Sequence, residues 1–69
     1  MKMQVSITHL PSGKTSKTEV VEVTEREYID QQVHIYKNIV SLEYLLVGDE
    51  IWPGDLIRSS CVISIYEVK

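Results

Sequence analysis

One stretch of this sequence decides its fold class: residues 24–40, TEREYIDQQVHIYKNIV. Thr24 and Glu27 have the spacing of a capping box, in which each side chain accepts a hydrogen bond from the other residue's backbone N–H. The acidic residues in the first turn and a half also suit the positive end of a helix. We therefore predict a helix from about Glu25 to Val40.

Apolar and amphipathic side chains recur along one predicted face of this helix, with Ile35 off that face. The face follows the i, i+4, i+8 rows of a helix. It contains Tyr28, Ile29, Gln32, Val33, Tyr36, Ile39 and Val40. Short apolar runs also fit a strand, so an alternating strand through Val33, Ile35 and Lys37 is the alternative.

Strand signals precede the predicted helix. Residues Met1–Thr8 alternate apolar and polar without an error, which indicates a half-buried strand. Pro11 and Gly13 then mark a turn, and we expect a mobile loop through Ser16. A second strand is predicted over Thr18–Val23, where Val20 breaks the alternation through a bulge or an uncovered outer face.

Period-two patterning returns after the helix. Residues 42–47 are largely apolar on both faces, which predicts a strand that is central or covered on both sides. Gly48-Asp49 predicts a turn into a short strand over residues 50–52, which Pro53-Gly54-Asp55 ends. The last strand covers residues 61–66. Together these segments predict an α+β domain spanning residues 1–69, with a small, mainly antiparallel sheet, one helix packed on a face, and the order ββαβββ.

Composition supports this class. The 69 residues include 21 β-branched Val, Ile and Thr but no Ala and no Phe, which disfavours a helical bundle. A single Cys excludes an internal disulfide, and so small a core predicts help from self-association. No apolar run is long enough for a membrane span, and the start does not resemble a signal peptide, so we expect a soluble, cytoplasmic protein.

Charge is distributed unevenly along the chain. Residues 1–18 carry three Lys and no acid, whereas residues 19–57 carry nine acids against two bases, within a total of −3. Nucleic acid is disfavoured as a partner, because phosphate binding needs clustered Lys and Arg side chains. This chain lacks such a cluster, even near its aromatic residues. The acidic middle suits a basic protein surface, although it also suits a simply solvated face.

No residue pattern predicts catalysis or a bound metal. Cys61 alternates with Ile63 and Ile65 on the predicted buried face, and neither His9 nor His34 lies in a motif that would activate it. Asp49, Glu50 and Asp55 are close in sequence but match no known calcium-binding loop. We predict no catalytic residue, no metal site and no cofactor.

The segment from Val47 to Asp55 is the strongest candidate for partner binding. It contains the single Trp and three acids with no base, and Trp anchors with polar surroundings are typical of protein–protein interfaces. The alternative is that the Trp closes one end of the core as a lid. The predicted partner-binding residues are Tyr44, Asp49, Glu50, Trp52 and Asp55.

Three functions follow from these observations. The first is a non-enzymatic protein-binding module that forms a homodimer or small oligomer, in its most specific form a phage or mobile-element inhibitor that occupies a basic surface of a host protein. The second is an oligomeric binder of a nucleotide or other anion, with its site between subunits and Lys14, Lys17 and Arg58 as its positive side. The third is a structural subunit whose strand edge a neighbour completes.

Overall fold

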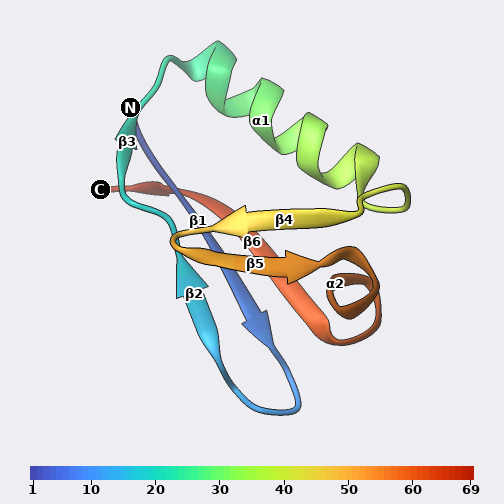
Figure 1. Cartoon of the computed structure of the whole chain (residues 1–69). Coiled ribbons are helices and arrows are strands. Elements are labelled where there is room, and N and C mark those ends of the chain that lie inside the picture. The colour runs from blue at the N-terminus through green and yellow to red at the C-terminus, as the bar shows by residue number, and fades with distance from the viewer.

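The computed structural model describes all 69 residues and shows an α+β fold with the element order βββαββαβ (Figure 1). All strand pairs are antiparallel. The predicted class and the antiparallel pairing are therefore confirmed, but the strands form two sheets instead of one, and the structure adds one short strand and one short helix. The elements are β1 (Lys2–His9), β2 (Thr15–Lys17), β3 (Val21–Glu22), α1 (Glu25–Asn38), β4 (Tyr44–Val47), β5 (Glu50–Pro53), α2 (Gly54–Ser60) and β6 (Cys61–Val68).

The central strand of the larger sheet is β1, which pairs with β6 on one side and with β2 and then β3 on the other. Met3, Val5 and Ile7 are buried on one face of β1, as its alternation predicted. The other face is polar, and there the Tyr66 hydroxyl donates a hydrogen bond to Gln4 Oε1 at 2.6 Å. The sheet thus has one covered face and one solvated face.

The bounds predicted for the second strand and the preceding loop are wrong. Pairing with β1 already begins at Thr15, so the loop between the two strands is shorter than predicted. The pairing is interrupted at residues 18–20 and resumes in β3. In this gap Thr18 replaces regular pairing: its Oγ1 accepts the Val5 N–H at 3.0 Å, and its own N–H donates to the Val5 carbonyl at 2.9 Å. Val20, which broke the alternation, lies exposed in the gap.

The predicted helix is present as α1, and its capping box is complete. Glu27 N–H donates to Thr24 Oγ1 at 3.1 Å, while Thr24 N–H donates to Glu27 Oε1 at 2.9 Å. Residues 33–37 are helical, so the alternative strand is excluded. The structure contains no helix long and apolar enough to cross a membrane.

The face that α1 turns to the sheet differs from the predicted one. Ile35 packs against the buried cluster of Met3, Val5 and Ile65, although the pattern placed it off the core face. Ile29 and Val33, which the pattern placed on that face, are about half exposed. The row toward the core is Tyr28, Gln32, Ile35 and Ile39.

The β4–β5 hairpin crosses in front of the larger sheet in Figure 1. Val47 and Trp52 point inward and form a buried cluster with Ile7 and Ile57. The turn at Gly48-Asp49 is confirmed, with Gly48 at a φ of +63°. The prediction that β4 is covered on both faces is wrong, because only β5 pairs with it and its outward side chains are exposed.

A seven-residue helix, α2, lies where the sequence predicted only a break. Gly54 begins this helix, is buried, and donates its N–H to the Glu43 carbonyl at 2.7 Å. A Cβ at this position would collide with the Leu42 carbonyl oxygen, so only glycine permits this close approach. The start of α2 is thereby fixed against the segment that leads into β4.

Candidate functional site

Trp52 is part of the core and is not an exposed anchor. Its residue is only 4% exposed and packs with Ile7, Val47 and Ile57. Strand alternation explains the placement, because Trp52 lies opposite Leu45 on the face of the hairpin that covers the sheet. The burial leaves the indole Nε1 without a hydrogen-bond partner. The lid interpretation of Trp52 fits this structure, and the interface-anchor interpretation does not.

Two of the three predicted acids are paired with bases, one from another segment and one from the same helix. Glu50 Oε2 lies 2.9 Å from Lys14 Nζ, and Asp55 Oδ1 lies 2.6 Å from Arg58 Nη2. Lys14 also lies 5.9 Å from the centre of the Trp52 ring, within reach of a cation–π interaction. Asp49 forms no ion pair and is exposed at the hairpin turn.

The outward side of the hairpin is apolar and open to solvent. Tyr44, Leu46 and Ile51 are 54%, 58% and 67% exposed, and Leu46 lies directly opposite Ile51 across the two strands. We call these three residues the hairpin outer face. Tyr44 was predicted as a partner-binding residue, but Leu46 and Ile51 were missed. The signal for Leu46 was the largely apolar character of both faces of residues 42–47, which was interpreted as a strand that is central or covered on both sides.

Carboxylates flank the hairpin outer face at both ends. Asp49 lies at the turn and Glu43 precedes β4 at the opposite end, where Asp55 follows β5; Glu50 lies opposite Val47, on the inner face of the hairpin. The Asp55 side chain is 99% exposed despite its contact with Arg58. An apolar centre with charged groups around it is the usual anatomy of a protein interface.

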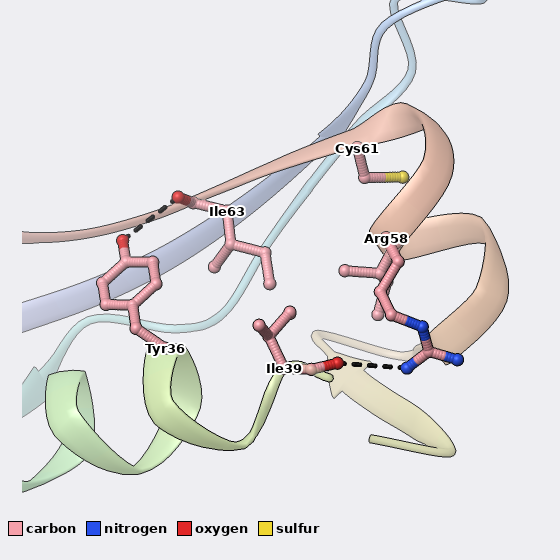
Figure 2. Close-up of a pocket in the computed structure, with 6 residues that line it drawn as sticks. Tyr36, Ile39, Arg58, Cys61 and Ile63 are labelled. Carbon is pink, nitrogen blue, oxygen red and sulfur yellow. Dashed lines mark hydrogen bonds between the residues drawn. The ribbon is translucent and has the colours of Figure 1, made fainter. Parts of the chain in front are cut away.

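A pocket of about 270 Å³ lies between α1, α2 and β6 (Figure 2). Its polar groups already have partners: the Tyr36 hydroxyl donates to the Ile63 carbonyl at 3.1 Å, and Arg58 Nη1 donates to the Ile39 carbonyl at 3.0 Å. The volume is slightly below the range of about 300–1,000 Å³ that is typical of ligand sites. The pocket lining is Tyr36, Ile39, Ile57, Arg58, Cys61 and Ile63.

Cys61 is a half-buried thiol on this pocket wall. Strand pairing places it directly opposite His9, yet the His9 ring contacts Ser12 Oγ, at 2.7 Å from Nδ1. Burial raises the pKa of the Cys61 thiol above its ordinary value of 9.0. Since the thiolate is the nucleophilic form, this environment works against covalent catalysis by Cys61.

The three cations predicted for an anion site do not line one pocket. Arg58 lines the pocket between the helices, whereas Lys14 lines a second one of about 170 Å³ that also includes His9, Glu50 and Trp52. Lys17 lines neither. No group of three or more His, Cys, Asp or Glu side chains is placed to hold a metal ion.

Comparison of the chain with protein-family models, curated proteins and solved structures gives no match. Its function is therefore inferred from its own surface. In the pocket, the hydroxyl and guanidinium groups are engaged in holding the fold together. The hairpin outer face has no such internal role and is the strongest candidate for a functional site.

Proposed function

We propose that this chain is a non-enzymatic protein-binding module that binds a basic protein surface through the hairpin outer face. The observation that carries the proposal is the exposure of Tyr44, Leu46 and Ile51 side by side on one rigid hairpin. Each of them leaves more than half of its surface in water. Covering such a face releases about 25 cal/mol for each Å² of apolar surface buried.

The core beneath the hairpin supports a binding role for its outer side. Val47 and Trp52, at 0% and 4% exposure, fix the inner face against the sheet, so the outer side chains are presented on an ordered platform. A preorganised surface loses less conformational entropy when it binds. Trp52 thus contributes by supporting the hairpin and not by contacting the partner.

Charge supports a basic surface as the class of partner. Glu43 at one end of the hairpin outer face and Asp49 at the other form no ion pair, whereas Glu50 and Asp55 are paired with Lys14 and Arg58. Complementary charge raises the rate of encounter and orients the partners. A protein with Lys and Arg around an apolar depression fits this surface, and inhibition of a basic host protein is the most specific form of the proposal.

Capture of a partner from lysate of the source cells tests the proposal. The double variant Leu46→Ser/Ile51→Ser removes most of the hairpin outer face, and Val62→Ser, at 47% exposure on the polar face of the larger sheet, is the matched control. We expect the unaltered chain and the control to capture the same protein and the double variant to lose it. Asp49→Lys should weaken the capture, most strongly at low salt.

Two outcomes contradict the proposal. One is capture of the same partner by the double variant at undiminished yield, while circular dichroism shows that it is folded. The other is the absence of any protein whose capture depends on Leu46, Ile51 or Asp49. The ligand-binding alternative is tested separately by thermal shift with a nucleotide and metabolite panel, because a specific ligand raises Tm.

A further inference from the structure

A second apolar row runs along α1 and ends at Val40, in the turn that follows the helix. Ile29, Val33, Tyr36 and Val40 are 49%, 53%, 48% and 78% exposed. Their spacing of four, three and four residues is that of the a and d positions at which paired helices meet. We call these four residues the α1 outer stripe.

The orientation of α1 keeps this stripe outside the fold. The stripe is rotated by about 100° from the row that packs on the sheet, because successive residues of a helix differ by about 100°. Side chains of both rows bind the backbone of β6: Tyr28 and Gln32 of the core row donate to the Ile65 carbonyl at 3.3 and 3.4 Å, and Tyr36 of the stripe donates to the Ile63 carbonyl. These bonds oppose rotation of the stripe toward the core.

We propose that the α1 outer stripe binds the same stripe of a second copy of this chain, with the two helices antiparallel about a two-fold axis. A two-fold contact requires a self-complementary surface. With the axis between Val33 and Tyr36, Val33 of each copy meets the partner's Tyr36, and Ile29 meets the partner's Val40.

The charges beside the stripe match this arrangement. Asp30 and Lys37 lie one heptad apart along the same border of the stripe. In the antiparallel pair, Asp30 lies opposite the partner's Lys37, and Lys37 lies opposite the partner's Asp30. In a parallel pair the two Asp30–Lys37 borders would lie on opposite sides of the contact, so these opposite-charge pairs would not form. The charge pattern therefore selects a second copy and also its direction.

The hairpin outer face does not fit a second copy in this way. Its unpaired carboxylates, Glu43 and Asp49, lie one at each end, so two copies facing each other there would repel. The α1 outer stripe has both signs of charge on one border. The fold thus separates a self-association surface on α1 from a surface for a basic partner on the hairpin.

The dimer should be weak. A helix of 14 residues is about 21 Å long, so the contact falls in the class below about 1,200 Å² that is typical of transient complexes. Sedimentation analysis of the full chain between about 1 μM and 1 mM covers this range of affinity. We expect a monomer–dimer equilibrium that Val33→Asp weakens on the order of tenfold or more, because burying an unpaired carboxylate is costly.

The matched control is Val62→Asp, which adds the same charge at a similarly exposed position on another face and should leave the equilibrium within about twofold of the unaltered chain. Circular dichroism verifies that both variants fold. A chain that remains monomeric at 1 mM overturns the proposal and leaves the stripe to another partner. Equal dimerisation of Val33→Asp and the unaltered chain overturns it as well.

Charge reversal tests the direction of the helices. Asp30→Lys and Lys37→Asp should each weaken the dimer severalfold at low salt, and the double reversal should restore it, because it recreates the opposite-charge pairs. The existing contact of Asp30 with Arg26, at 3.7 Å between two exposed side chains, is too weak to determine folding. Single reversals that leave the dimer unchanged contradict the antiparallel arrangement.

Discussion

Arg58 on α2 donates a hydrogen bond from Nη1 to the carbonyl oxygen of Ile39, the residue that caps the end of α1, at 3.0 Å. The same nitrogen lies 2.7 Å from the Leu42 carbonyl. Carbonyls at the end of a helix have no partner within the helix, and a cation there also compensates the helix dipole. Arg58 therefore joins the two helices through the segment that leads into β4.

Replacement of Arg58 by Met should lower the free energy of unfolding by about 1.5–3 kcal/mol, the usual contribution of hydrogen bonds from a charged group. Urea denaturation measures the change. Asp55→Asn is the control: it removes only the exposed ion pair of Arg58 and should cost at most about 1 kcal/mol. If the free energy of unfolding falls by the same small amount in both variants, Arg58 does not hold the helices together.

The capping box predicts a pH dependence of stability. Hydrogen bonds from the backbone N–H and the side chain of Thr24 lower the pKa of Glu27 below its ordinary value of 4.5. The ionised carboxylate is therefore favoured in the folded state. Its stabilising contribution is complete at a pH well above 4.5 and is lost as the pH falls through the lowered pKa of the folded state.

Comparison with Glu27→Gln isolates this effect, since Gln can make the same capping bond without titrating. Urea denaturation at a series of pH values from 7 down to 3 should show the stability of the unaltered chain falling faster with acid than that of the variant. Parallel curves for the two proteins would show that Glu27 is not held in its ionised form.

Burial of Trp52 is directly measurable, because it is the only Trp in the chain. At 4% exposure, its fluorescence should be quenched by acrylamide much less in the native protein than in urea, and its emission should shift to longer wavelength on unfolding. Native quenching as strong as that of the unfolded chain would place the ring at the surface, and would return Trp52 to the candidate interface residues.

Burial of Cys61 predicts slow alkylation. Because burial raises the pKa of this thiol, the rate of reaction with iodoacetamide should reach half its maximum only above pH 9.0 in the folded protein. The same chain unfolded in urea should react faster at pH 8. A native thiol with half-maximal reactivity near neutral pH would contradict this environment and would reopen a catalytic role.

Local sequence signals predicted those features that local physics determines. The alternation of Met1–Thr8, the capping box at Thr24 and the turn at Gly48 each specify their structure within a few residues. The helix α2 was missed because it has only seven residues and follows Pro53, which ends a strand by itself. Its position depends on Gly54 fitting against the Leu42 carbonyl, a contact between separate segments.

The candidate surfaces were harder to predict, because two faces of the same element are apolar. On α1, either the row with Ile35 or the row with Val33 satisfies helical periodicity, and the contacts of Tyr28 and Tyr36 with β6 select the first. In β4 and β5, the burial of Trp52 turns Leu46 and Ile51 to solvent. Tertiary contacts made these choices, so a periodic pattern alone does not distinguish the core from an interface.

Photo-crosslinking from Tyr44 is the most direct test of the claim that the hairpin outer face binds a basic protein. Benzoylphenylalanine replaces Tyr44 in one chain and Val62 in a control chain, and crosslinked peptides are identified by mass spectrometry after irradiation in lysate of the source cells. We expect one dominant partner, crosslinked from Tyr44 but not from Val62 and attached within a Lys- and Arg-rich surface. Crosslinking of the same partner from Val62 alone, or equally from both positions, would contradict this claim.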